Sequence, residues 1–148
     1  MDLKFVFKSF EQLTLNELYA YLNLRSEVFV VEQNCVYQDL DNKDQVSFHV
    51  LVHDLDQLVA CARIVPVGLA YPEISIGRVI VAEAYRKQKL GHELLRFCIA
   101  QIEKHYGPQP IVLSAQAHLQ DFYKKHNFAP DGAIYLEDGI PHIHMIKQ

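Results

Sequence analysis

Apolar residues recur along this chain with two different periods, and each period predicts one kind of element. Residues 3–8 alternate between apolar and polar, which is the pattern of a half-buried strand. After Thr14, which opens a capping box, Leu18 and Leu22 follow at helical spacing and predict an amphipathic helix that continues toward Phe29. The same reasoning predicts strands at residues 46–53, 58–67, 74–81, 111–115, 133–136 and 140–146, and helices at residues 91–105 and 118–126.

Turn residues between these segments determine how the strands connect. Asp54–Gln57 predicts a hairpin turn, and Asp138–Gly139 predicts another between the last two strands. Strands joined by hairpins pair antiparallel, whereas the strand–helix–strand passage from Ile74 to Ala115 predicts a right-handed parallel crossover. The sequence therefore predicts an α/β protein of the α+β type. Its mixed, mostly antiparallel central sheet of about seven strands has helices on both faces.

The composition is that of one globular domain spanning residues 1–148. Of the 148 residues, 50% are hydrophobic and 22% are charged, and the formal net charge of −4 argues against general nucleic-acid binding. No apolar run reaches the roughly 18 residues of a membrane span, and the N-terminal segment lacks a signal-peptide pattern. Cys35, Cys61 and Cys98 lack CxxC spacing and are expected to be reduced thiols in a cytoplasmic protein.

The strongest chemical signal lies in residues 74–97, where a strand leads through a basic loop into a helix predicted to open at Gly91. The first turn of a helix leaves backbone N–H groups without partners and carries partial positive charge. Arg86, Lys87 and Lys89 add positive charge just before it. The combination predicts a site for a phosphate or pyrophosphate group, beside a strand edge along which an extended cofactor fits.

This unit, the order of elements and the segment FYKKHNF at residues 122–128 together resemble the GNAT superfamily of acetyl-CoA-dependent N-acetyltransferases. The resemblance covers nearly the whole chain, and VIVAEAYRKQKLG at residues 79–91 is among its most specific parts. It implies a cytoplasmic N-acetyltransferase that uses acetyl-CoA. Other segments are similar to the ElaA-like branch, namely LRSEVFVVEQNCVYQDLDNKD, IGRV, LSAQAHLQDFY and EDGIPHIHM at residues 24–44, 76–79, 113–123 and 137–145.

The resemblance also implies which residues hold the cofactor. Strand Val79–Val81 matches the segment whose backbone binds the pantetheine arm, and the Val81 N–H would polarise the thioester carbonyl. The pyrophosphate loop, Arg/Gln-x-x-Gly-x-Gly/Ala, falls on Arg86–Gly91, with lysine at positions 87 and 89, where glycine is common. The two lysines predict a stiffer loop with added charge toward the phosphates. The implied cofactor-binding residues are Val79, Ile80, Val81, Arg86, Lys87, Gln88, Lys89, Leu90, Gly91, Gln116 and Tyr123.

For catalysis, Tyr123 matches the family tyrosine that protonates or hydrogen-bonds the departing CoA thiolate. A phenol suits this role because the reference pKa values of phenol and thiol lie within about 2 units. Gln116 stands where many relatives have a cofactor-binding asparagine. Direct attack by the amine is expected, because none of the three cysteines lies in a nucleophile motif.

An ammonium substrate must lose a proton before it attacks, and the sequence offers several bases. Glu73 precedes the central strand on the side used for a catalytic carboxylate in some relatives, and a base acting through water is equally compatible. The acidic loop of Asp39, Asp41 and Asp44 is expected either to be a solvated loop or to attract a cationic amine. The other candidate bases are Glu32, Asp41, Asp44, His49 and His142.

Several alternatives stay open at this point. His142 and His144 share one face of a strand, but no partner stands at ligand spacing, so no metal site is predicted. A CoA-binding regulatory or interaction module without turnover, or an acyltransferase that uses a longer acyl donor, fits the same motifs. The sequence does not identify the amine, which a small molecule or a peptide would supply. A homodimer is compatible with it.

Overall fold

The sheet of this protein consists of two antiparallel halves that meet along one short parallel contact. The computed structural model describes residues 1–148. Eight strands form one sheet in the order β1-β2-β3-β4-β5-β8-β6, and β7 also pairs with β8. Only β4 and β5 run parallel, and every other pair is antiparallel. This confirms the predicted mixed, mostly antiparallel sheet, with one strand more than expected.

The elements follow the predicted order, with small shifts at their ends. The unpredicted strand, β6, has two residues, which is too short for alternation to reveal it. The strands are β1 (Leu3–Ser9), β2 (Phe48–Asp54), β3 (Gln57–Val65), β4 (Ile74–Val81), β5 (Ile111–Gln116), β6 (Ala129–Pro130), β7 (Tyr135–Glu137) and β8 (Ile140–Lys147). The helices are α1 (Leu15–Arg25), α2 (Leu90–Tyr106) and α3 (Gln120–Lys124), with short helical segments η1 (Phe10–Gln12), η2 (Ser26–Glu32), η3 (Asp44–Val46), η4 (Glu83–Gln88) and η5 (Ala117–Leu119).

The first helix begins at the predicted capping box and changes its geometry at its end. The Thr14 hydroxyl accepts a hydrogen bond of 3.0 Å from the Glu17 N–H, and the Glu17 carboxylate accepts one of 2.8 Å from the Thr14 N–H. After Arg25 the helix widens into η2, which is π-helical. Such segments are frequent at functional sites. Here η2 carries Phe29 to the wall of the cavity described below.

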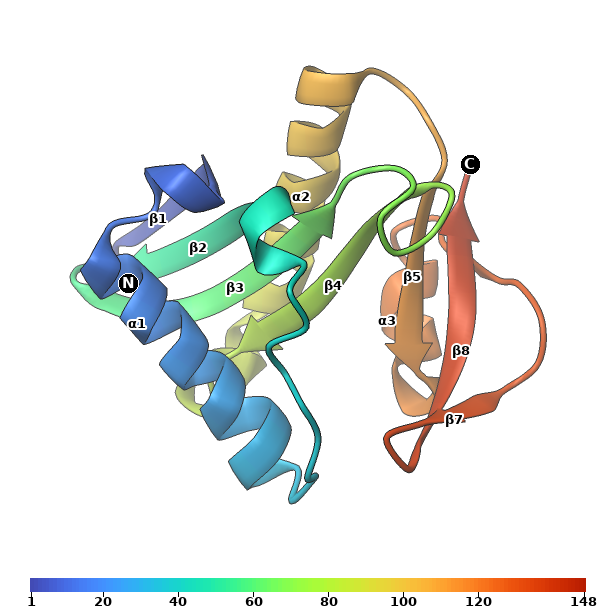
Figure 1. The fold of residues 1–148 in the computed structure, drawn as a ribbon, viewed down its shortest axis with the longest axis horizontal. Helices are drawn as coiled ribbons and strands as arrows, with labels where there is room; N and C mark the ends of the chain where they lie inside the picture. The colour runs from blue at the N-terminus through green and yellow to red at the C-terminus, as the bar shows by residue number, and fades with distance from the viewer.

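Helices cover both faces of the sheet, as predicted, with α1 in front of β2–β4 and α2 behind them (Figure 1). Neighbouring residues of a strand point to opposite faces. Leu51 therefore packs with Tyr21 of α1, whereas Val52 belongs to the cluster formed with Leu94 of α2. None of the helices combines the length and the apolar character that crossing a bilayer takes.

The contact between β4 and β5 is short and determines where the site lies. The two strands pair only through Ile74 with Ile111 and Ser75 with Val112, and then diverge (Figure 1). From Ile76 onward, β4 has β3 on one side and no strand on the other. Backbone groups on that open edge are therefore available to a ligand.

Candidate active site

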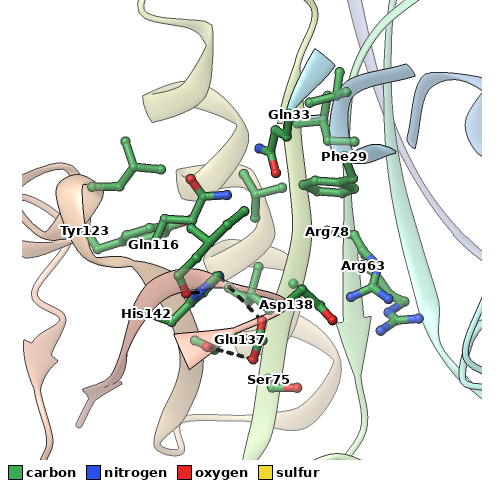
Figure 2. A pocket seen from close by; sticks show the side chains of 18 of the residues that line it. Phe29, Gln33, Arg63, Ser75, Arg78, Gln116, Tyr123, Glu137, Asp138 and His142 are labelled. Carbon is green, nitrogen blue, oxygen red and sulfur yellow. Dashed lines mark hydrogen bonds and ion pairs between the residues drawn. The ribbon is translucent and has the colours of Figure 1, made fainter. Parts of the chain in front are cut away.

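The divergence of β4 and β5 opens a cavity of about 1230 Å³ between the two halves of the sheet. Figure 2 shows Phe29 and Arg78 on one wall and Tyr123, Gln116 and His142 on the other. Pockets for one small ligand usually measure about 300–1000 Å³. The cavity is therefore large enough for a long cofactor and a second substrate.

Most of the predicted cofactor-binding residues line this cavity. Leu90 does not line it, because its side chain is 1% exposed and packs in the core, and Gln88 is also outside the lining. Glu73, the candidate base, lies before β4 begins and outside the cavity lining as well. The structure brings together Val79, Ile80, Val81, Arg86, Lys87, Lys89, Gly91, Gln116 and Tyr123.

The backbone of Val81 has the orientation that an oxyanion-binding group needs. The Ala82 N–H bonds the Val59 carbonyl of β3 at 2.8 Å. Because successive N–H groups of a strand point to opposite edges, the Val81 N–H faces the open edge. The Val81 carbonyl accepts a hydrogen bond of 2.9 Å from Arg86 Nε. Only the N–H of Val81 is therefore left for a ligand on this side.

A β-bulge in β4 stands next to this position. The pairing with β3 shifts between Cys61 and Arg63, and Arg78 adopts a φ of 49°. A left-handed non-glycine residue costs free energy and needs its surroundings to hold it. The Arg78 side chain is held by Asp39, with 2.7 Å from Nε to Oδ1 and 2.8 Å from Nη2 to the carbonyl oxygen. A bulge of this kind bends the strand and so changes the direction of β4 beside the site.

The three aspartates of the acidic loop are paired with arginines and have no free charge to attract an amine, which corrects both expectations for them. Three arginines from α1, β3 and β4 neutralise its three aspartates. Arg25 contacts Asp39 at 3.0 Å and Asp44 at 2.8 Å. Arg63 binds both oxygens of Asp41 at 2.8 Å each, and Arg78 binds Asp39. The pairing partners are 14 to 39 residues apart along the chain, so local patterning could not reveal them.

Pairing with arginine or burial makes four of the candidate residues weaker bases. Burial opposes ionisation of Asp41 and Asp44, but hydrogen bonds and charge from Arg63 and Arg25 hold the pKa of each carboxyl below its usual range. Burial lowers the pKa of His49, which accepts a hydrogen bond of 2.8 Å from the Tyr21 hydroxyl and donates one of 2.9 Å to the Asp44 carbonyl. Glu32 forms an ion pair of 2.8 Å with Arg86.

We expect the free energy of unfolding to fall in two stages as the pH is lowered. Below about pH 6.5 His49 takes up a proton in the unfolded chain, whereas in the folded protein it is buried and resists protonation. Below about pH 4 the unfolded chain binds protons that the native Asp41 and Asp44 resist. Urea unfolding at a series of pH values measures both stages. His49→Gln keeps a donor and an acceptor and should make the first stage shallower, whereas an unchanged first stage would contradict this reasoning.

The pyrophosphate loop has lysine at two positions where the family commonly has glycine, and its backbone favours glycine at only one of them. Lys89 has a φ of 59°, which lies in the left-handed region where glycine is favoured. Lys87 does not have a positive φ. Gly91 serves a different purpose: a Cβ added there would lie 3.3 Å from the ring of Phe122. The glycine thus lets the FYKKHNF segment approach the first turn of α2. His92 strengthens this contact by a 2.8 Å hydrogen bond to His126.

Replacing the two lysines with glycine, one at a time, should therefore affect stability differently. Lys89→Gly relieves a left-handed residue and is expected to be neutral or to stabilise by up to about 1 kcal/mol. Lys87→Gly adds backbone freedom without relieving strain and is expected to destabilise by about 0.5–1 kcal/mol. Each variant removes one lysine charge, so each serves as the control for the other. Equal shifts in the urea midpoint would contradict this assignment.

Tyr123 enters the cavity from the wall opposite β4 (Figure 2). Its side chain is 7% exposed and lies edge-on to the rings of Phe122 and Phe128. Burial, with a smaller effect of Cys98, raises the pKa of Tyr123 to about 12. The hydroxyl therefore stays protonated at neutral pH and is available as a hydrogen-bond donor.

Glu137 is a cavity residue that the sequence interpretation missed. Its carboxylate lies 3.5 Å from Nε2 of His142, and both residues line the cavity. The predicted Asp138–Gly139 turn is confirmed, with a positive φ at both residues. The turn could have revealed Glu137, because alternate residues on either side of a two-residue turn share one face of the hairpin. Glu137 and His142 are on the same face for this reason. His144 lies outside the cavity lining and faces Asp131 at 3.4 Å.

Comparisons with known proteins agree with this geometry. The family described as "Acetyltransferase (GNAT) domain" matches residues 11–148. Protein ElaA of Escherichia coli strain K12 is 45% identical over 139 residues, covering 93% of this chain and 91% of ElaA. The structure of an acyl-CoA N-acyltransferase from Pseudomonas aeruginosa superposes with a TM-score of 0.95 at 42% identity, covering 99% of this chain and 100% of that one.

Two further solved structures extend the comparison. The crystal structure of Escherichia coli ElaA gives a TM-score of 0.93 at 42% identity, with 99% of each chain covered. Aminoglycoside 6′-N-acetyltransferase in complex with coenzyme A shares the fold at 16% identity, with a TM-score of 0.71 over 96% of each chain. The family match and the two ElaA comparisons confirm the resemblance seen in the sequence. The chain belongs to the GNAT family of acetyltransferases, as an ElaA-like acyltransferase that depends on acyl-CoA.

Proposed function

We propose that this protein is a cytoplasmic N-acetyltransferase that moves the acetyl group of acetyl-CoA to a primary amine by direct attack. The observation that supports the proposal most is the open edge of β4, because the Val81 N–H faces a cavity that Tyr123 enters from the opposite wall. A donor for the thioester oxygen and a donor for the leaving sulfur then belong to one site. The unpaired cysteines support the cytoplasmic location.

The chain offers groups for the pyrophosphate and for the pantetheine arm of acetyl-CoA. Lys87, Lys89 and the first turn of α2 suit the pyrophosphate, since both lysines line the cavity and the helix start provides free N–H groups. Arg86 helps to hold the loop in place beside β4, because its guanidinium donates hydrogen bonds to the Val81 carbonyl and to Glu32. The open edge of β4 suits the amides of the pantetheine arm.

Tyr123 acts on the leaving group chiefly as a hydrogen-bond donor. Its pKa of about 12 lies roughly 3–4 units above the reference value for a thiol, so complete proton transfer to the thiolate is uphill. A hydrogen bond that strengthens as negative charge develops on sulfur stabilises the transition state without that cost. Proximity of amine and thioester in one cavity supplies a further part of the rate.

Calorimetry with acetyl-CoA, CoA and longer acyl-CoAs, followed by release of the CoA thiol over a broad panel of primary amines, tests the proposal. We expect binding of acetyl-CoA and turnover with at least one amine class. Binding without turnover would favour a regulatory or interaction module instead. Preference for long acyl chains would favour a different acyltransferase, and absence of CoA binding would rule out all three.

A further inference from the structure

A carboxylate and an imidazole face each other inside the cavity, beside the turn of the last hairpin (Figure 2). Oε2 of Glu137 lies 3.5 Å from Nε2 of His142. The His142 side chain is 10% exposed and that of Glu137 is 48% exposed, so the carboxylate stays accessible to a ligand. The other Glu137 oxygen accepts a hydrogen bond of 3.3 Å from Ser114, which fixes the carboxylate against β5.

Hydrogen bonding determines which nitrogen of His142 carries the proton of the neutral ring. Nδ1 lies 2.7 Å from the Ile140 carbonyl oxygen, and a carbonyl only accepts, so Nδ1 is the donor. Nε2 of the neutral ring is then an acceptor turned toward Glu137. Two acceptors 3.5 Å apart suit one group with several donors, and a primary ammonium has three.

The other acids and imidazoles of the cavity are less suitable. Glu32 and Asp41 are paired with arginines, and His92 is bonded to His126 beside the pyrophosphate loop. Asp138 and His118 also line the cavity, but neither forms a carboxylate–imidazole pair there.

The groups that face His142 from the neighbouring strands are mostly neutral. β5 places Gln116 opposite it, and β7 places Tyr135 beside it with near-parallel rings. Glu137 is the charged group in contact with it, with Asp138 adjacent along the turn.

We propose that Glu137 and His142 together bind the ammonium group of a cationic primary amine, and that His142 Nε2 accepts the proton that the amine must lose. This inference rests on the proposed acyl transfer. The amine lone pair then forms the C–N bond at the acyl carbon, and the C–S bond breaks. The Tyr123 hydroxyl donates a hydrogen bond to the departing thiolate, which takes its proton from water after it leaves. The second nitrogen proton passes to water, and His142 also releases its proton to water. Glu137 is a positioning residue, because it acts through the ammonium and the ring.

The test compares His142→Gln and Glu137→Gln with the unmodified protein, using acetyl-CoA and putrescine, lysine amide and tyramine as probe amines. Near neutral pH, His142→Gln should lower kcat/KM by about 10²–10³-fold with unchanged acetyl-CoA affinity. The loss should shrink as the pH approaches about 10, because solution then deprotonates the amine. Glu137→Gln should mainly raise KM for the amine.

His144→Gln is the matched control. His144 lies on the same strand and faces a carboxylate at 3.4 Å, but outside the cavity lining, so its loss should leave kcat/KM and the pH profile unchanged. A merely structural role of His142 would not produce recovery at high pH. If His142→Gln keeps the rate and the pH profile of the unmodified protein, the inference is wrong while the acyl transfer stands. If the unmodified protein turns over no amine, the proposed function itself fails.

A second readout does not need turnover. Nitrogen NMR of histidine-labelled protein should show His142 protonated at Nδ1 when neutral, and putrescine should perturb its Nε2 resonance in the unmodified protein but not in Glu137→Gln. A His142 ring protonated at Nε2 instead, or an equal perturbation in both proteins, would overturn the assignment.

Discussion

Arg25→Met is expected to destabilise the protein by about 3–5 kcal/mol, because it removes one charge from a buried set and leaves the opposite charges underpaired. Arg25 is fully buried and contacts Asp39 and Asp44, and its guanidinium lies 4.9 Å from the centre of the Tyr21 ring. Methionine fills similar volume and is apolar, so the loss would reflect charge more than packing. Urea unfolding at neutral pH measures the change.

Two further variants show whether charge balance is the cause. Lys8→Met removes a partly exposed pair with Glu17 at 2.9 Å and should cost no more than about 1 kcal/mol. Combining Arg25→Met with Asp44→Asn restores neutrality of the buried set, so the double variant should lose less stability than the sum of the two singles. Strict additivity, or an Arg25→Met loss as small as that of Lys8→Met, would contradict the charge explanation.

Tyr123→Phe is expected to lower kcat by about 10²-fold or more at saturating substrates, while the affinity for acetyl-CoA stays within about threefold. Phenylalanine keeps the buried ring contacts with Phe122 and Phe128 and removes only the hydroxyl. An interaction made only as the C–S bond breaks affects kcat and not binding. Release of the CoA thiol gives kcat, and calorimetry gives the affinity.

Tyr85→Phe is the control for this experiment. The Tyr85 hydroxyl donates a 2.7 Å hydrogen bond to Asp54 and lies outside the cavity lining, so its removal should not change kcat. Unchanged turnover in Tyr123→Phe would exclude the hydroxyl from the reaction. Weakened acetyl-CoA binding with unchanged kcat would instead assign Tyr123 to cofactor binding.

Much of the fold was predictable because the sequence encodes it locally. The runs rich in Val, Ile and Ala that form β2 and β3, the Thr14 cap and the Asp138–Gly139 turn each depend on a few adjacent residues. The β4–loop–α2 unit was predictable for the same reason, and residues on both sides of its loop do line the cavity.

The electrostatics of the site were not predictable in this way. The sequence gives no sign that Asp39 and Asp41 are paired. Their partners, Arg78 and Arg63, come from strands that only the folded sheet brings close to the acidic loop. The left-handed Arg78 left no signal either, since arginine has no preference for that conformation. Glu73 was chosen by its position in the sequence, and the course of the chain before β4 leaves it outside the cavity lining.

The divergence of β4 from β5 leaves one edge of β4 without a neighbouring strand beyond Ser75. On the proposed binding mode the pantetheine arm pairs with the open edge of β4, so acyl-CoA extends the hydrogen bonding of the sheet as well as supplying the acyl group. Its binding free energy then adds to the unfolding free energy, by about 2.7 kcal/mol at a ligand concentration a hundred times Kd. Amides of β4 should become slow to exchange with solvent deuterium when the ligand is bound. The lifetime of this protein would thereby follow the acyl-CoA supply of its surroundings.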